Sequence, residues 1–210
     1  MPTTTAPSAP PGRRTQQERR EATVARLLDA TIATVTEIGY AKASVKEICD
    51  RAGVSHGGLF RHFPTRLDLM VAAFEEVARR QLDGFVERFD QRPGDGDPQA
   101  EAVRLLRDAA RAPINAVWFE LLTAGRTDDA LRTHLEPVTR RYYDQIEQLA
   151  AQLPFAEDYD PRRFAAGVRL ALHLFDGEAT RRAVAPEPEA EDAVLALVTD
   201  LLATAARPAP

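Results

Sequence analysis

The residue types with the most chemical content lie in one short stretch, Ser44–Phe63 (SVKEICDRAGVSHGGLFRHF). Its second half predicts a helix with an outward face that is small, polar or basic: His56, Gly57, Gly58, Arg61 and His62. Adjacent glycines cost a solvent-exposed helix roughly 1 kcal/mol each relative to alanine, so this helix is best explained if it presses against another surface. Polar and basic groups on a short helix suit the base edges and phosphates of a DNA major groove. The pattern indicates DNA recognition, and a helical hairpin inside an α-domain is the alternative.

Patterns typical of enzymes and metal sites are missing from the sequence. A single cysteine, Cys49, excludes zinc sites built on two cysteines, and there is no His-Glu-x-x-His, glycine-rich phosphate loop or nucleophile elbow. The nearest group is His173, Asp176 and Glu178, in which the first two stand about one helical turn apart. These side chains could line a polar site or take a metal, or form a polar patch near a helix end. We expect no catalytic residue and no cofactor.

Capping residues divide the Ser44–Phe63 stretch into two short helices joined by a tight turn. Ser44 is a good N-cap, Gly53 ends the first helix because only glycine enters a left-handed C-cap cheaply, and Ser55 starts the second. Leu59 and Phe63, four residues apart, put one apolar stripe toward the protein and leave the opposite face for a partner. The pattern therefore predicts a helix-turn-helix.

Longer amphipathic helices are predicted on both sides of this pair. A helix from about 15 to 38 stops at Gly39 and covers the two short helices. Thr65 and Asp68 have the spacing of a capping box at the start of a helix that runs to about Phe89 and links the two parts of the chain. After a loop at 91–98, periodicity predicts helices at about 99–111, 113–124, 127–152, 161–183 and 189–206. Pro137 should bend or divide the third of these. No strand pattern appears, so we expect an all-α fold with about nine helices.

Length and charge limit the class of protein. A chain of 210 residues with 44% hydrophobic content can bury a sizeable core. The net charge of -5 is uneven, because residues 13–70 hold ten Lys and Arg against seven Asp and Glu, while 71–210 hold seventeen against twenty-five. A mildly basic module on an acidic body favours one DNA-docking face. Residues 1–12 should be disordered. The single cysteine suits a cytoplasmic protein, and we expect no leader and no membrane span.

Residues 20–75 resemble the N-terminal domain of the tetracycline-repressor (TetR) family of transcription regulators. The match is the spacing of Gly39-Tyr40, Ser44, Ile48, Ala52-Gly53-Val54-Ser55, Leu59-Phe60, His62-Phe63-Pro64 and Leu67. A second stretch, Trp118-Phe119-Glu120-Leu121 followed by Arg126-Thr127-Asp128, is often seen in members with a variable ligand domain. The resemblance implies a homodimer that binds a near-palindromic operator in double-stranded DNA, as a repressor, and is released by a small-molecule effector. It also implies a DNA-binding domain at 13–64, a connecting helix at 65–90 and an effector-binding and dimerisation domain at 91–206.

The expected DNA contacts divide into phosphate positioning and base reading. Helix starts that flank the groove and outward-projecting side chains suit phosphates, which assigns Ser44, Lys46, His62 and Arg66 to that role. Base edges are assigned to Ser55, His56, Gly57, Gly58 and Arg61. Arg61 could instead take a phosphate.

Two positions depart from the family pattern. Gly58 stands where a small hydroxyl residue or alanine is usual, and Phe60 replaces a usual tyrosine whose hydroxyl takes a phosphate. Both changes remove contacts, so Arg61 and Arg66 should carry more of the affinity.

The C-terminal half is expected to hold the effector pocket and the dimer interface. Aromatic and apolar residues on its helices suit a cavity with polar handles: Phe85, Phe89, Trp118, Phe119, Leu122, Tyr142, Tyr143 and His173. The last two helices are apolar over a wide arc, which favours a four-helix bundle across a two-fold axis over burial within one chain. Its candidate residues are Phe164, Val168, Leu172, Phe175, Val194, Leu197, Val198 and Leu201. The rival function is a helical small-molecule-binding protein or enzyme that keeps a vestigial DNA-reading head.

Overall fold

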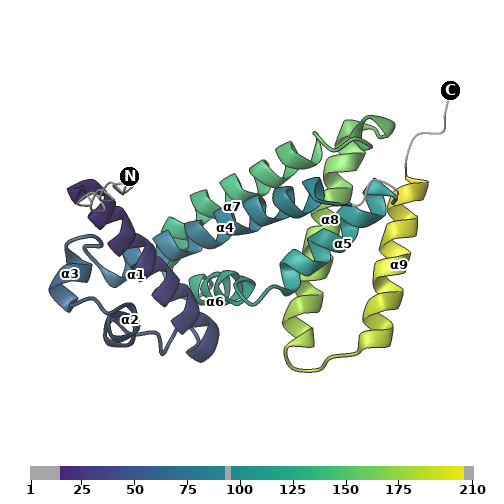
Figure 1. Cartoon of the computed structure of the whole chain (residues 1–210). Helices are drawn as coiled ribbons and strands as arrows, with labels where there is room; N and C mark the ends of the chain where they lie inside the picture. Colours follow the sequence, from purple (N-terminus) through teal and green to yellow (C-terminus); the bar gives the residue numbers. More distant parts are fainter. Residues whose placement is uncertain (1–14, 93–95, 206–210) are drawn as a thin grey trace, which may run out of the picture.

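The computed structural model describes residues 15–92 and 96–205, and within these ranges it consists of nine α-helices, one short 3-10 turn and no strand (Figure 1). The helices are α1 (Gln16–Ile38), α2 (Val45–Ala52), α3 (His56–Phe60), α4 (Arg66–Asp90), α5 (Pro98–Arg111), α6 (Asn115–Gly125), α7 (Asp129–Ala150), α8 (Pro161–Arg182) and α9 (Pro188–Thr204). The all-α prediction is confirmed. The tail predicted to be disordered, 1–12, lies outside the described residues.

Capping residues set the boundaries of the N-terminal helices, at Ser44 and Thr65 as predicted and also at Thr15. Thr15 forms a capping box with Glu18 at the start of α1, and Thr65 forms one with Asp68 at the start of α4. The Ser44 hydroxyl accepts a hydrogen bond from the backbone N–H of Glu47 at 3.3 Å. These side chains satisfy backbone donors that a helix start leaves unpaired.

Gly53 ends α2 in the left-handed region, with φ of 62° and ψ of 37°. A β-carbon is disfavoured in that conformation, which is why glycine stands there. The tight turn between α2 and α3 follows directly.

Pro137 does not divide its helix, so that part of the prediction is wrong. The helix α7 runs from Asp129 to Ala150 with Pro137 inside it. The residues on either side, Leu135 and Val138, are buried in the core, and Pro137 itself is exposed. Burial of both halves of α7 offsets the roughly 3 kcal/mol that an internal proline costs.

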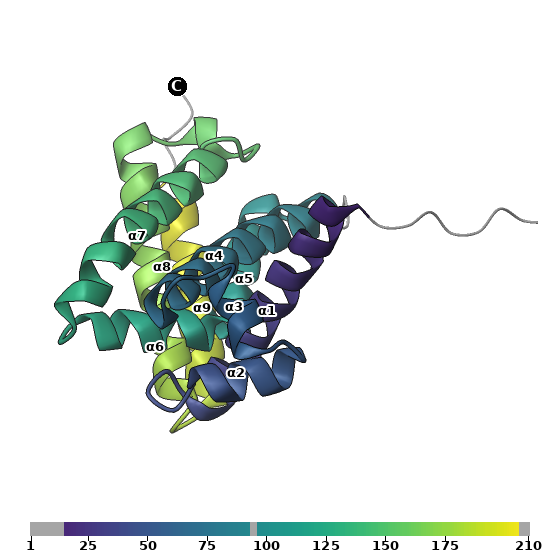
Figure 2. The same cartoon turned by 90° about the vertical axis from the view of Figure 1, so that its left-hand side faces the viewer.

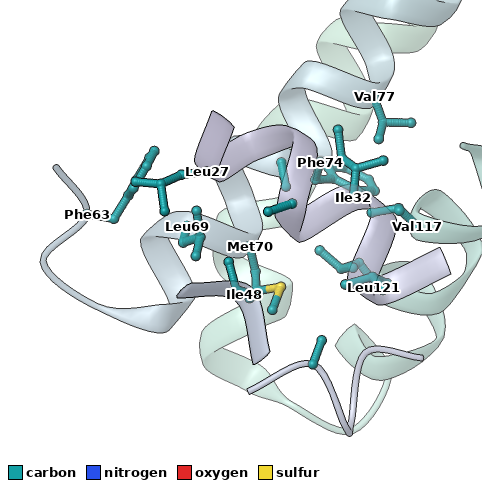
Figure 3. Close-up of a cluster of buried hydrophobic side chains, with 14 of the residues drawn as sticks. Leu27, Ile32, Ile48, Phe63, Leu69, Met70, Phe74, Val77, Val117 and Leu121 are labelled. Atoms are coloured by element: carbon teal, nitrogen blue, oxygen red, sulfur yellow. The ribbon is translucent and has the colours of Figure 1, made fainter. Parts of the chain in front are cut away.

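One hydrophobic core joins the first three helices, which we call the head (α1–α3), to the body (α4–α9). Leu27 of α1 and Ile48 of α2 belong to the same cluster as Phe74 of α4 and Leu121 of α6. Figure 3 shows these side chains meeting between the helices. Because the buried side chains of the head belong to this shared core, a displacement of α4 or α6 is transmitted to the head through packed side chains. The domain boundaries at 64 and 90 stay a prediction.

The end of the body away from the head is built by α5, α8 and α9 (Figure 1). Phe175 of α8 and Val103 of α5 form a second core cluster against which Leu195 and Val198 of α9 pack. Viewed along the molecule in Figure 2, the head stands in front of this end. None of the helices in the described ranges has the length and apolar character needed to cross a membrane.

Candidate DNA interface and ligand cavity

The short helix α3 has one anchored side and one open side. Leu59 is fully buried and Phe63 is nearly so, which fixes the helix on the head. On the other side His56 and Arg61 are exposed, and Phe60 is 46% exposed. The Ser55 hydroxyl caps the helix by accepting from the backbone N–H of Gly58 at 3.1 Å. The predicted apolar stripe and outward face are therefore both present.

The two glycines of α3 differ in their surroundings. A β-carbon on Gly57 would meet nothing within 4 Å, so its open side is available to a partner. A β-carbon on Gly58 would lie 2.9 Å from Cγ1 of Val54 and 3.2 Å from Oγ of Ser55. The prediction that both glycines face outward is wrong for Gly58, because its small size is required by the turn within the chain.

The predicted phosphate contacts have unequal freedom. Lys46 is exposed and pairs with Asp50 one turn on, at 2.7 Å, and this hydrogen bond raises the pKa of Lys46. His62 is half-buried, and its Nδ1 has no hydrogen-bond partner within the described part of the chain. The hydroxyl of Ser44 already caps α2. Lys46 is thus placed on the surface, while Ser44 and His62 also belong to the head's own structure.

Arg66 holds the head together through the backbone. Its Nε donates to the carbonyl of Ala43 at 3.0 Å and its Nη2 to the carbonyl of Tyr40 at 2.6 Å. Its guanidinium also lies over the Tyr40 ring, 4.5 Å from the centroid. These contacts use two of the five N–H donors of the guanidinium and fix its position, so Arg66 acts first as a brace between α4 and the loop before α2.

The body contains a cavity of about 410 Å³ between α4, α5, α7, α8 and α9. Its wall is largely apolar and includes Phe85, Val103, Leu106, Ile146 and Phe164. The polar side chains that reach it are Gln81, Gln99, Tyr142, Tyr159 and Arg163. The volume falls in the range of small-molecule sites, and the composition suits an apolar ligand with a few polar contacts.

A polar group lies at the end of this cavity nearest α6, and we call it the inner polar end: Gln81, Asn115, Tyr142 and Asp176. The Tyr142 hydroxyl donates to Oε1 of Gln81 at 3.2 Å, Nε2 of Gln81 donates to Oδ1 of Asn115, and Nδ2 of Asn115 donates to the carbonyl of Ala110 at 2.9 Å. All four residues line a small void of about 20 Å³, and Gln81 and Tyr142 line the large cavity as well. The two spaces share a wall formed by these two polar side chains together with Leu106 and Ala109.

Burial controls the ionisation of this group. Removal from water raises the pKa of Asp176 to about 6, and a hydrogen bond with the Asn115 amide opposes part of that rise. Burial also raises the pKa of Tyr142, so that its hydroxyl stays a hydrogen-bond donor. The inner polar end therefore offers one carboxyl group in otherwise neutral surroundings.

Comparison with known proteins identifies the family. The model of bacterial regulatory proteins of the tetR family matches residues 27–73, which include α2, α3 and the start of α4. An uncharacterised HTH-type transcriptional regulator of Mycobacterium tuberculosis is 46% identical over 189 residues, covering 90% of this chain and 97% of that protein. The chain belongs to the TetR family of transcriptional regulators.

Two further proteins to which this chain is similar bear on function. The HTH-type transcriptional repressor KstR of Mycobacterium tuberculosis is 36% identical over 85 residues, which are 34% of this chain and 37% of KstR. The crystal structure of the multidrug binding protein EbrR complexed with malachite green aligns with a TM-score of 0.57 and 27% identity, covering 88% of this chain and 98% of EbrR. This TetR-family chain is therefore a DNA-binding transcriptional regulator.

The predicted ligand residues of this TetR-family protein separate into cavity and core. Phe85 and Tyr142 line the cavity, and Trp118 lines the small void while stacking on Phe74 at 4.0 Å. The remaining residues do not line the cavity: Phe89, Phe119, Leu122, Tyr143 and His173. Periodicity identifies the apolar face of a helix but does not show which part of that face borders a cavity.

Gln81 and Asn115 were missed by the sequence analysis, although a signal for Gln81 exists. It continues the stripe of Met70, Phe74 and Val77 on the buried face of α4, where a polar residue is unusual. Asn115 opens α6 and has no comparable signal. The position of Gln81 within the apolar stripe of α4 was thus the sequence signal for the inner polar end.

The group His173, Asp176 and Glu178 does not form one site. Glu178 is buried and pairs with Arg111 at 2.5 Å, whereas His173 is exposed beside the Tyr143 ring. Among the described residues, no three His, Cys, Asp or Glu side chains are grouped as a metal site. Of the three, only Asp176 lines the small void beside the cavity.

The predicted dimer residues point in different directions. Leu197 and Leu201 are each 57% exposed on α9, and Leu170 of α8 is 65% exposed. Val194 and Val198 are half-buried, while Phe164 and Val168 line the cavity. Leu172 and Phe175 are buried inside one chain, so the expectation that they face a second copy is wrong. They complete the contact of α8 with its own neighbours.

Proposed function

We propose that the protein is a homodimeric repressor that binds a near-palindromic operator through α3 and leaves it when a small molecule occupies the body cavity. The observation that carries the proposal is the division of α3 into a buried side, anchored by Leu59, and an exposed side with Arg61 and an open Gly57. A helix anchored in this way can enter a major groove without loss of its own core contacts.

The proposed base-reading contacts come from the open side of α3. Ser55, His56 and Gly57 lie at its N-terminal end, where a recognition helix meets base edges, and Arg61 stands exposed at its C-terminal end. Phe60 can contact a thymine methyl group. Phosphates would be held by Lys46, with smaller contributions from Ser44, His62 and the remaining N–H groups of Arg66. Gly58 serves the turn instead of the groove.

The cavity supports control by a small molecule. It is about 410 Å³ in volume, and its wall draws on five helices, so a ligand there would bear on α4 directly. EbrR, which resembles this chain, is described as a multidrug binding protein in complex with malachite green, and KstR is described as a repressor. A ligand shifts the protein off DNA only if it favours one arrangement of the two heads over the other.

Selection of bound fragments from random duplex DNA, at a stated salt concentration, tests the proposal. We expect recovery of an inverted repeat with half-sites about 34 Å apart, or one turn of DNA, because a two-fold dimer reads two successive major grooves. Binding that vanishes with salt and shows no sequence preference would favour the rival, a binding protein or enzyme with a vestigial head.

A further inference from the structure

We infer that the effector is an organic cation, an apolar molecule whose protonated amine is received by Asp176 at the inner polar end of the cavity. This assignment rests on the proposed function, since it takes the cavity to be the effector site. It names the chemistry of the effector, which neither the fold nor the family fixes.

The first argument is the lack of a cation beside Asp176. Asp176 is half-buried on α8, and within the described ranges it forms no ion pair with a lysine, arginine or histidine. Its neighbours are the neutral groups of Asn115 and Tyr142. The two acids that are buried in the described part of the body are both paired: Glu178 with Arg111 at 2.5 Å, and Glu191 with Arg111 at 3.2 Å. A carboxylate that is partly removed from water and has no cation beside it carries a desolvation cost, which a positively charged ligand would offset.

The second argument is the route from the cavity to Asp176. Four residues border both the large cavity and the small void that Asp176 lines: Gln81, Tyr142, Leu106 and Ala109. The Gln81 and Tyr142 side chains are joined by a 3.2 Å hydrogen bond, and a change of rotamer at these two positions would open a passage beside Leu106 and Ala109. A ligand amine could then replace the Tyr142 hydroxyl as a donor to Gln81 and reach Asp176.

The third argument is the aromatic surface at this end. Trp118 lies 4.5 Å from Tyr142, measured between ring centroids, and both border the small void. Aromatic faces attract cations, the more strongly when water is excluded. The same surroundings would repel a carboxylate ligand, because Asp176 already supplies a negative charge.

Among the described residues, Arg163 is the one charged side chain that lines the cavity, and it makes a weak anion site. It lies exposed in the first turn of α8. The carboxylate of Asp160 caps the same turn, accepting from the backbone N–H groups of Arg162 and Arg163 at 3.1 Å each. Water and a neighbouring acid weaken an exposed cation as an anion site.

The test compares decylamine, decanol and decanoate, which share one apolar chain and differ only in the charge of the head group. Calorimetric titration of each into the full-length protein at pH 7.5 measures the preference directly. We expect decylamine to bind about tenfold more tightly than decanol, or better, and decanoate to bind most weakly. In Asp176→Asn the affinity for decylamine should fall to that for decanol, while the affinity for decanol stays the same. The matched control is Arg163→Gln, which should leave the preference for decylamine in place.

Several outcomes would overturn the inference. The unsubstituted protein could bind decylamine and decanol equally tightly, or could bind none of the three compounds. Decanoate could bind most tightly and lose that affinity in Arg163→Gln. The preference for decylamine could also survive in Asp176→Asn. The head-group comparison in the unsubstituted protein stands even if Asp176→Asn fails to fold. Operator selection without ligand separates the two proposals: a protein that binds an operator but not decylamine retains the proposed function and loses this inference. Binding of decylamine without an operator would show the reverse.

Discussion

Two arginines near the expected groove illustrate how residues of one type take different roles. Arg61 is exposed at the end of α3, and no ion pair of its side chain is present within the described ranges. Arg66 is half-buried and donates hydrogen bonds to the backbone carbonyls of Ala43 and Tyr40. The first is free to meet DNA, while the second shapes the surface that meets it.

Replacing each arginine by alanine should separate these roles. Arg61→Ala should weaken operator binding about tenfold to a hundredfold and change the free energy of unfolding by less than about 0.5 kcal/mol. Arg66→Ala should lower the free energy of unfolding by about 2–3 kcal/mol, because two charge-assisted hydrogen bonds are lost. Fluorescence anisotropy and urea denaturation give the two quantities. If Arg61→Ala binds the selected operator as well as the unsubstituted protein, our assignment of α3 is wrong.

Asp176 should make stability depend on pH in a known direction. Its pKa is about 6 in the folded protein against an ordinary 3.8, so the unfolded chain gives up the proton first as the pH rises. The resulting penalty is absent below pH 4, grows between pH 4 and 6, and is complete above pH 6. Asp176→Asn should therefore be more stable than the unsubstituted protein above pH 6, by up to about 3 kcal/mol.

Urea denaturation across pH 4 to 8 measures this difference, with Asp144→Asn as the control. Asp144 is exposed on α7, so its replacement should change stability little at any pH. A constant difference between Asp176→Asn and the unsubstituted protein over the whole pH range would contradict the prediction.

At the scale of elements, α6 contacts both the head and the inner polar end, as α4 also does. Asn115 and Trp118, in its first turn, border the inner polar end, and Glu120 accepts a hydrogen bond from the backbone N–H of Tyr40 in the head at 3.0 Å. A β-carbon on Gly39 would lie 3.4 Å from the same carboxylate. A shift of α6 caused by a ligand would therefore move the loop that precedes α2.

Glu120→Ala should uncouple the head from the cavity. We expect the ratio of operator affinities without and with decylamine to fall about fivefold or more, because coupling energy is carried by contacts that differ between the two states. Exchange of the Tyr40 amide hydrogen should also become faster. Glu136→Ala, on the exposed side of α7, is the control and should change neither quantity. An unchanged affinity ratio in Glu120→Ala would show that the signal passes elsewhere, for example through α4.

The elements were predictable from sequence to a large extent, and the cavity was not. Ser44, Gly53 and Thr65 mark helix ends because caps act locally, through hydrogen bonds and backbone conformation that a few residues decide. The cavity arises where five helices fail to close on one another, which depends on packing across the whole body. Phe85 lines the cavity and Phe89 is buried outside it, although both lie on one helix, because no local rule separates a cavity wall from a core.

At the scale of the whole molecule, charge and shape agree with docking by the head. The described part of the mildly basic stretch, residues 15–70, lies at one end, and the acidic body carries the cavity and α9 (Figure 1). This asymmetry would direct the head toward DNA and keep the acidic end away. The same end exposes Leu170, Leu197 and Leu201, which a single chain leaves in water.

Leu197→Arg should convert the proposed dimer to a monomer. Full burial of a leucine side chain contributes about 1.5–3 kcal/mol, and a two-fold interface contains the same leucine from each protomer. One substitution therefore removes this burial energy twice. It also places two arginine charges near each other at the interface. Leu197 does not line the cavity, so ligand affinity should be retained. Analytical ultracentrifugation measures the mass, and operator binding should weaken because each half-site alone supports only part of the affinity. The control is Val86→Arg, which changes an exposed apolar residue on α4 instead of α9. This variant should remain dimeric. A dimer that persists in Leu197→Arg would place the interface away from this face of α9, and the two heads would then need another arrangement to reach successive grooves.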